Sequence, residues 1–258
     1  MTCNEIRSAT LDSSQGIILF NPCFMAKPRP EFFSSEYWNS CKALLGHTTG
    51  RGPTYFIRWR QSAELVLRAY TRGGAVRAVL EDRFLWTGLA RSRAWREWHL
   101  LAGLQRSGLP VPFPIAALIR RKGLYYTASI ITKRIQNAQP LSTLMFTTQL
   151  ELQTWVRIGA AVRQLHQAGV YHADLNAHNI LLDQQSRVWI IDFDKGKTYP
   201  AMPFWRRANL RRLKRSLEKL TSIHSQRPFD REKWLSLLSG YTRPKAGKVA
   251  NTLPLDKQ

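Results

Sequence analysis

The chain has 258 residues, of which 44% are hydrophobic and 11% aromatic, so it is long and apolar enough for one packed domain or two lobes and is not a disordered tail. Lys and Arg total 39 against 17 acidic residues, which gives a formal net charge of +22. The electrostatic field of so large a positive charge favours anionic partners, such as nucleic acid, an anionic membrane face or a phosphorylated substrate.

The cysteines, the first residues and the lack of a long apolar stretch bear on the cellular compartment of the protein. The three cysteines form no CxxC pair and no disulfide framework, which indicates a reducing compartment. The first residues lack the pattern of a signal peptide, and no apolar stretch approaches the roughly 18 residues of a membrane-spanning helix. We therefore expect a protein that is soluble or lies on a surface.

The first half of the chain reads mainly as strands. Residues 1 to about 30 carry several prolines and are expected to form an extended arm, and residues 35–45 a short helix. The segments 54–60 and 64–70 are rich in aromatic and β-branched residues and predict strands. Apolar residues recur at intervals of three over 93–106, which predicts an amphipathic helix.

The second half becomes helical. A strand pair is predicted at 115–119 and 124–131, around a Lys-Gly turn. A strong amphipathic helix follows at 150–168, ended by a glycine, and then two short apolar strands at 180–182 and 188–191. The rest is helical and basic. Strands that precede helices in this way predict an α+β fold with two lobes.

The densest signal lies between Tyr171 and Lys195. His172-Ala173-Asp174, four residues and then Asn179 resemble the catalytic loop H-R-D-x-x-x-x-N of kinases, and Asp192-Phe193-Asp194 resembles their metal-binding D-F-G. Spacing and flanking elements both agree. The resemblance implies a two-lobed protein-kinase-like fold, with an arm and a strand-rich nucleotide-binding lobe over 1–134 and a small helical catalytic lobe with basic C-terminal helices over 135–258.

Phosphoryl transfer explains these residue types, because it requires alignment of the reactants and neutralisation of the triphosphate of ATP. We assign Asp174 to orient the acceptor hydroxyl and take its proton. Mg²⁺ prefers oxygen ligands, so we assign it Asp192 and the amide oxygen of Asn179. His172 is expected to be structural and to pack on Phe193. Each motif alone, a single His-x-Asp or one strand that ends in Asp, would not indicate a kinase; the two together at this spacing do.

The nucleotide side is less distinctive. Gly50 and Gly52 precede a strand and match a shortened phosphate-covering loop, although an ordinary turn would look the same. Arg68 stands where kinases place a lysine; its planar fork can bind phosphate, or it is a surface strand residue. Glu97 would be its ion-pair partner, or else a solvated acid on its helix.

Two departures concern the substrate. Asp194 replaces the glycine of D-F-G, and no A-P-E segment follows in the short remaining chain. This argues against a protein substrate and for a small molecule or a glycolipid.

Within the kinase superfamily, the chain is similar to the bacterial kinases of 3-deoxy-D-manno-octulosonic acid (Kdo). The segments that carry the resemblance are L-V-L-R-A-Y-T-R-G-G (65–74), R-F-L-W-T-G-L (83–89), R-A-W-R-E-W-H-L-L (93–101), G-L-P-V-P-F-P-I-A-A (108–117), Y-H-A-D-L-N-A-H-N-I-L-L-D (171–183) and I-D-F-D-K-G (191–196). The resemblance implies transfer of the γ-phosphate of ATP to the 4-hydroxyl of Kdo on a lipid A precursor, in lipopolysaccharide core synthesis, at the cytoplasmic face of the inner membrane.

The positive charge agrees with such a substrate. The segment 204–220 holds seven cations and one acid, and its leucines share one helix face. We expect the leucines to face the core, and the basic face to meet an anionic leaflet or the carboxylates and phosphates of the acceptor. No nucleic acid and no protein partner is predicted.

Two alternatives remain open. A kinase of aminoglycoside or choline type shares the catalytic motif, but such enzymes usually have acidic pockets for cationic substrates. A catalytically inactive kinase fold that binds nucleic acid is permitted by the charge. Against it, all three catalytic positions are intact, and basic residues do not alternate with aromatic ones in an RNA-binding motif.

Overall fold

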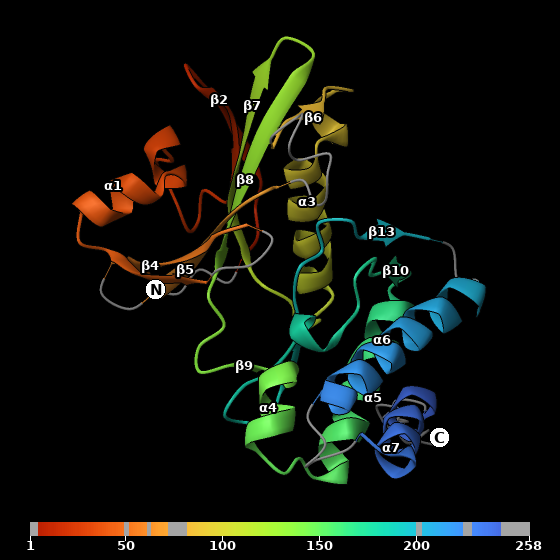
Figure 1. Cartoon of the computed structure of the whole chain (residues 1–258). Coiled ribbons are helices and arrows are strands. Elements are labelled where there is room, and N and C mark those ends of the chain that lie inside the picture. The colour runs from red at the N-terminus through yellow and green to blue at the C-terminus, as the bar shows by residue number, and fades with distance from the viewer. Residues whose placement is uncertain are drawn as a thin grey trace, which may run out of the picture.

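The computed structural model describes residues 5–48, 52–60, 63–71, 82–199, 203–223 and 229–243. Its N-terminal part is an antiparallel sheet in the order β1-β2-β7-β8-β5-β4-β3, with β6 paired to β8 (Figure 1). The strands are β1 (Ala9–Ser13), β2 (Gly16–Phe20), β3 (Leu44–Thr48), β4 (Thr54–Trp59), β5 (Ala63–Ala69), β6 (Phe84–Leu85), β7 (Pro114–Lys122) and β8 (Tyr125–Lys133).

The two faces of this sheet bury different clusters. Along β7, Leu118 belongs to the buried cluster that contains Phe32 and Trp38, whereas its neighbour Ile119 belongs to the cluster that contains Trp98. Successive side chains of a strand point to opposite faces, so a strand buried on both sides reads as a continuous apolar run. Helix α1 (Ser35–Ser40) and the 3₁₀ turn η1 (Pro30–Phe33) cover one face, and α3 (Arg93–Arg106) covers the other.

Most of the predicted strands and α3 are confirmed, and two expectations for the N-terminal region are wrong. Residues 9–20 form a β-hairpin rather than an extended arm, because the apolar strand β2 pairs with β7 and buries Ile18 and Leu19. The helix predicted over 35–45 ends at Ser40, and the chain then turns through Lys42, with a φ of 53°, into β3.

The C-terminal part consists of α4 (Leu141–Thr147), α5 (Leu152–Gln167), α6 (Pro203–Ile223) and α7 (Arg231–Thr242). Two small antiparallel sheets join it: β12 (Val188–Ile190), β11 (Ile180–Leu182) and β9 (Gln139–Pro140) form one, and β10 (Val170–Tyr171) with β13 (Lys197–Thr198) forms the other. The chain is thus a mixed α+β protein, with an N-terminal antiparallel sheet and C-terminal helices.

The helices of this part pack closely. Leu213 and Leu217 of α6 are fully buried, which confirms the predicted core-facing leucine side of this helix. Gly159 of α5 and Gly240 of α7 let the two helices approach until a Cβ on Gly159 would lie 1.9 Å from the carbonyl oxygen of Leu237. Among the helices that the structure describes, none has the length and apolarity that a membrane crossing requires.

Candidate active site

The segment between β10 and β11 forms a closed loop that presents Asp174. The side chain of Asn176 caps the 3₁₀ turn η3 (Ala177–Asn179) by accepting from the backbone N–H groups of His178 and Asn179, at 2.9 and 3.2 Å. The amide Nδ2 of Asn179 in turn donates to the carbonyl oxygen of Asp174 at 2.9 Å. This bond fixes the orientation of the amide group, so that its oxygen, Oδ1, points away from the carbonyl of Asp174 and can serve as an acceptor or a metal ligand.

A buried histidine ties this loop to the acidic segment that follows β12. His172 Nδ1 accepts from the backbone N–H of Asp174 at 3.2 Å, and Nε2 donates to the carbonyl oxygen of Ile191 at 2.9 Å. The ring packs on Phe193 at 4.9 Å, as predicted. Burial lowers the pKa of His172, which keeps the ring neutral and able both to donate and to accept.

Asp192 stands at a strained turn. Strand β12 ends at Ile190, one residue earlier than predicted, and Asp192 adopts a φ of 64° rather than continuing the strand. A non-glycine residue in this region is held there by its surroundings, and such strain concentrates at functional sites. The backbone N–H of Ile191 donates to the carbonyl oxygen of Asn179 at 3.0 Å, so the two predicted metal-binding residues are joined through the backbone.

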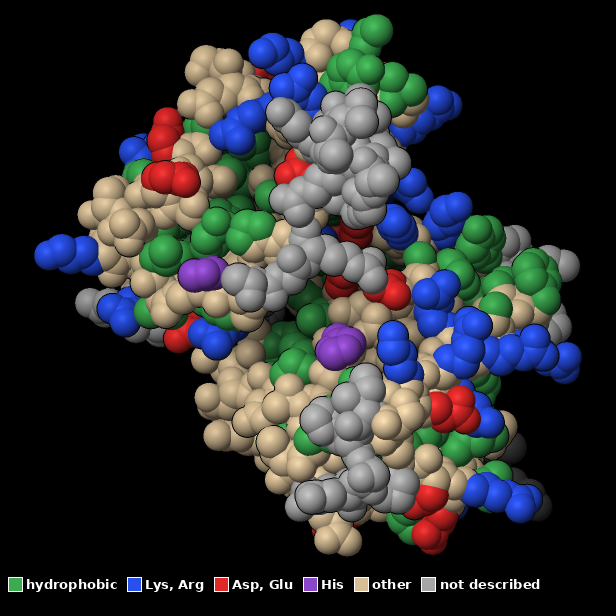
Figure 2. Space-filling view, in the orientation of Figure 1, with side chains coloured by type: hydrophobic (Ala, Val, Ile, Leu, Met, Phe, Trp, Pro, Cys, Tyr) green, Lys and Arg blue, Asp and Glu red, His purple; other side chains and the backbone are tan. Residues whose placement is uncertain are grey.

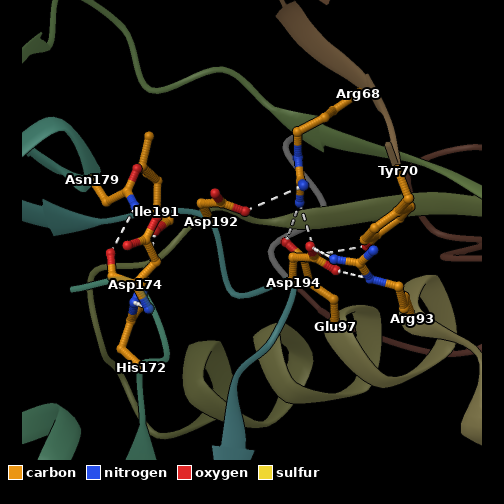
Figure 3. Close-up of polar contacts among 10 residues, drawn as sticks. All are labelled: Arg68, Tyr70, Arg93, Glu97, His172, Asp174, Asn179, Ile191, Asp192 and Asp194. Atoms are coloured by element: carbon orange, nitrogen blue, oxygen red, sulfur yellow. Dashed lines mark hydrogen bonds and ion pairs between the residues drawn. The ribbon is translucent and has the colours of Figure 1, made fainter. Parts of the chain in front are cut away.

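The predicted pair between sheet and helix is present. Arg68 Nη2, from β5, contacts Glu97 Oε1 and Oε2 of α3 at 2.6 and 2.8 Å, and the hydroxyl of Tyr70 donates to Glu97 Oε2 at 2.6 Å. Nη1 of the same guanidinium lies 3.2 Å from Asp192 Oδ1. In Figure 3, Asp192 lies between the Asp174–Asn179 pair and the Arg68–Glu97 pair.

The charges of this network reinforce one another. Burial opposes the charged form of Arg68, but Glu97 and Asp192 outweigh burial and raise its pKa, so the guanidinium is a permanent cation. Burial raises the pKa of Glu97, and the charge of Arg68 opposes that rise. Arg68 is therefore a structured internal cation, not a surface strand residue.

A second arginine pair was not predicted. Arg93, at the start of α3, contacts Asp194 through Nε at 2.5 Å and also through Nη2, and its guanidinium lies 4.5 Å from the centre of the Phe84 ring. Asp194 is the residue that departs from D-F-G, so this departure was the available signal. Asn209 of α6 was also missed; its Nδ2 donates to the carbonyl oxygen of His172 at 2.9 Å.

The glycine pair can be placed only in part. Gly50 lies outside the described residues. Gly52 lies in the turn before β4, two residues before Thr54, which pairs with Arg68 across the strands. A Cβ on Gly52 would lie 2.6 Å from Thr71 Cγ2, so the glycine allows this turn to pass close to the end of β5.

The residues fit a hard cation bound together with phosphate. Asp192 Oδ1 is buried and has no hydrogen-bond partner among the described residues, and its ion pair with Arg68 lacks hydrogen-bond geometry. The described residues contain no group of three or more His, Cys, Asp and Glu side chains arranged for a metal. Asp192 and Asn179 would supply two oxygen ligands, and phosphate oxygens and water would complete the coordination shell, as is usual for Mg²⁺.

In protein kinases a lysine–glutamate ion pair stands opposite the acidic residues that hold the metal and the triphosphate. The pair of Arg68 and Glu97 has the corresponding place beside Asp192 here, which indicates the class of phosphotransferases. The model of the lipopolysaccharide kinase (Kdo/WaaP) family matches residues 35–241, and the chain belongs to this family.

Relatives agree with this membership. A 3-deoxy-D-manno-octulosonic acid kinase of Haemophilus influenzae (strain 86-028NP) is 42% identical over 219 residues, which cover 82% of this chain and 90% of the relative. Proteins with the same name from Vibrio vulnificus (strain YJ016) and Mannheimia succiniciproducens are both 38% identical, over 88% and 83% of this chain and 95% and 92% of the relatives.

Proposed function

We propose that this chain is a Kdo kinase of lipopolysaccharide core synthesis, which transfers the γ-phosphate of ATP to the 4-hydroxyl of Kdo on a lipid A precursor. The observation that carries the proposal is the 42% identity to a relative with this activity in its name, over 90% of that relative. The geometry supports it, because one network joins Arg68, Glu97 and Asp192.

In this reaction the acceptor oxygen attacks the γ-phosphorus, the bond from that phosphorus to the bridging oxygen breaks, and ADP leaves. Asp174 orients the hydroxyl and receives its proton. Its side chain suits this task because it is 37% exposed and therefore accessible, while its backbone is held by His172 and Asn179.

The other side chains hold the nucleotide. Arg68 binds phosphate oxygens and is oriented by Glu97, while the turn at Gly52 covers the phosphates. Asn179 and Asp192 would hold Mg²⁺, which would neutralise the charge of the triphosphate.

The same proposal covers the architecture and the location. The chain would form two lobes of a protein-kinase-like fold, over 1–134 and 135–258, with the nucleotide between them. The acceptor is a lipid, so we place the chain peripherally at the cytoplasmic face of the inner membrane, held by its net charge of +22.

The alternatives are less well supported. A kinase for aminoglycosides or choline would bind a cationic acceptor, which the positive charge disfavours. An inactive kinase fold that binds nucleic acid would not need the constellation of Asp174, Asn179 and Asp192.

The test is phosphate transfer from γ-labelled ATP to a Kdo-bearing lipid A precursor, with kanamycin, choline and RNA as parallel acceptors. We expect label on the glycolipid alone, and NMR of the product should place the phosphate on O4 of Kdo. Label on another acceptor would reject the Kdo assignment. Binding of RNA without any ATP turnover would favour the inactive fold.

A further inference from the structure

Helix α6 runs alongside the catalytic loop, and its side chains contact the loop in order. Asn209 bonds both the backbone N–H and the carbonyl oxygen of His172. Arg212 Nη1 lies 3.6 Å from Asp174 Oδ1. Ser216 Oγ accepts from the backbone N–H of Ala177 at 3.2 Å. The helix positions are three and four residues apart, so they share one face, and the two flanking bonds fix Arg212 beside Asp174.

Arg212 lies close to Asp174 but does not form a hydrogen bond with it at this separation. A separation of 3.6 Å is longer than a hydrogen bond, and the side chains of Arg212 and Asp174 are 43% and 37% exposed. A guanidinium carries five N–H donors, so Arg212 retains donors for an incoming anion. A purely structural ion pair at such exposure contributes little to folding.

The surroundings of Arg212 are positive. Arg215 and Lys219 follow it at intervals of three and four on the same side of α6, and both are exposed. Figure 2 shows Lys and Arg side chains gathered over α6, next to the central region where acidic side chains are visible. An acceptor that reaches Asp174 over this helix therefore passes a row of cations.

The chemistry of the acceptor explains a cation at this place. Its hydroxyl must lie within hydrogen-bond reach of Asp174, so other groups of the same sugar lie within a few ångströms of Arg212. The substrate in the names of the relatives is an octulosonic acid, which carries a carboxylate. A sugar carboxylate near Asp174 would be repelled by it, and a guanidinium between the two removes this repulsion and can bind a carboxylate with two parallel hydrogen bonds.

We propose that Arg212 binds the carboxylate of the acceptor sugar and thereby selects an acidic sugar as substrate. The inference rests on the proposed function, which supplies the acceptor, but it concerns a residue to which that function gives no role. It makes Arg212 a determinant of acceptor specificity, without a part in binding ATP.

The test compares the wild type, Arg212→Gln, Arg212→Lys and the control Arg211→Gln. Arg211 is the exposed neighbour on the same helix, so its replacement removes the same charge on a different side of α6. Each is assayed with the Kdo-bearing lipid A precursor and with its Kdo methyl ester, in which the carboxylate is uncharged. Circular dichroism melting checks that all four chains fold.

We expect Arg212→Gln to raise KM for the acidic acceptor ~10- to 100-fold, as for loss of a charged hydrogen-bonded pair, with KM for ATP within about twofold of wild type. The wild type should prefer the acid over the ester, Arg212→Gln should lose this preference, and Arg212→Lys should retain part of it. Arg211→Gln should behave as wild type.

The inference is overturned if Arg212→Gln keeps the wild-type preference for the acid, or if it weakens both acceptors equally. A change confined to kcat or to KM for ATP also overturns it, because Arg212 would then act on the nucleotide or the transferred phosphate. Failure of the wild type to phosphorylate either acceptor would instead reject the proposed function itself.

Discussion

Arg68 is the side chain that joins the sheet, the helix α3 and the acidic segment of the site. One of its terminal nitrogens contacts both carboxylate oxygens of Glu97, and the other faces Asp192. A planar guanidinium can reach in these two directions at once, whereas the ammonium of a lysine is a single point charge. The lysine of the general kinase pattern is therefore not an equivalent replacement here.

Arg68→Lys is accordingly expected to lower kcat/KM ~10- to 100-fold, although it restores the residue type usual in kinases. Steady-state kinetics with ATP and the glycolipid acceptor measure the effect. Arg58→Lys is the matched control, since Arg58 is exposed on the neighbouring strand β4. Full activity of Arg68→Lys would mean that only the charge of Arg68 matters and that its bridging geometry does not.

The positions of residues that the structure brings together could be predicted where a local motif marks them. The spacing of Asp174, Asn179 and Asp192 is a local pattern, and the contact of Arg68 with Glu97 follows from the kinase resemblance. The pair of Arg93 and Asp194 was not predictable, because these residues are 101 positions apart and only the folded chain brings them together.

At the scale of elements, the C-terminal helices depend on close packing between α5 and α7. Gly159 faces the backbone of α7, and Gly240 faces the backbone of α5 in return, where a Cβ would lie 1.9 Å from the carbonyl oxygen of Val156. Backbone atoms cannot move aside as a flexible side chain can. Any side chain at either glycine must therefore push the helices apart.

Gly159→Ala should destabilise the protein by about 1–3 kcal/mol, the usual cost of overpacking, despite the better helix propensity of alanine. Gly103→Ala in α3 is the control, because nothing lies within 4 Å of a Cβ there. It should be neutral or stabilising by up to about 1 kcal/mol. Urea unfolding followed by tryptophan fluorescence distinguishes them, and equal effects would contradict the packing argument.

A buried histidine makes the same group of helices sensitive to acid. His166 of α5 bonds the hydroxyl of Tyr241 on α7 at 2.9 Å and the amide oxygen of Asn209 on α6 at 3.2 Å. Burial lowers its pKa from 6.5 to about 4. Below pH 6.5, His166 is protonated in the unfolded chain but stays neutral in the folded chain until about pH 4. The free energy of unfolding therefore falls as the pH drops through this window.

His166 alone should therefore cost about 2 kcal/mol of stability between pH 7 and pH 5. His166→Gln cannot titrate, so its free energy of unfolding should fall less over the same interval. His172, whose pKa is also lowered, remains in both chains and cancels in the comparison. Equal pH slopes for the two chains in urea unfolding would show that His166 does not titrate as argued.

The spacing of apolar residues predicted those helices and strands whose own sequence shows a helical or strand-like period. The apolar spacing over 93–106 gave α3 with the bounds that the structure has. The hairpin of β1 and β2 was missed because its stability comes from pairing with β7, about 100 residues later, and no local pattern in 1–30 reports that partner.

At the scale of the whole molecule, the net charge of +22 is larger than the few cations near the site account for. Exposed cations near an anionic leaflet contribute about 1 kcal/mol each, and salt screens them. The proposed peripheral location predicts sedimentation with vesicles that contain anionic lipids, and release of the chain as NaCl rises from about 0.05 to 0.5 M. Binding to neutral vesicles with equal strength, or no salt dependence, would contradict an electrostatic attachment.

The central claim is that Asp174 takes the proton of a Kdo hydroxyl. The measurement is the rate of labelled phosphate transfer to the Kdo-bearing lipid A precursor by the wild type, by Asp174→Asn and by Asp12→Asn, an exposed aspartate of β1 that serves as the control. We predict that Asp174→Asn lowers kcat about 10²- to 10⁴-fold with little change in ATP binding, and that Asp12→Asn matches the wild type. A wild-type rate in Asp174→Asn would contradict the account.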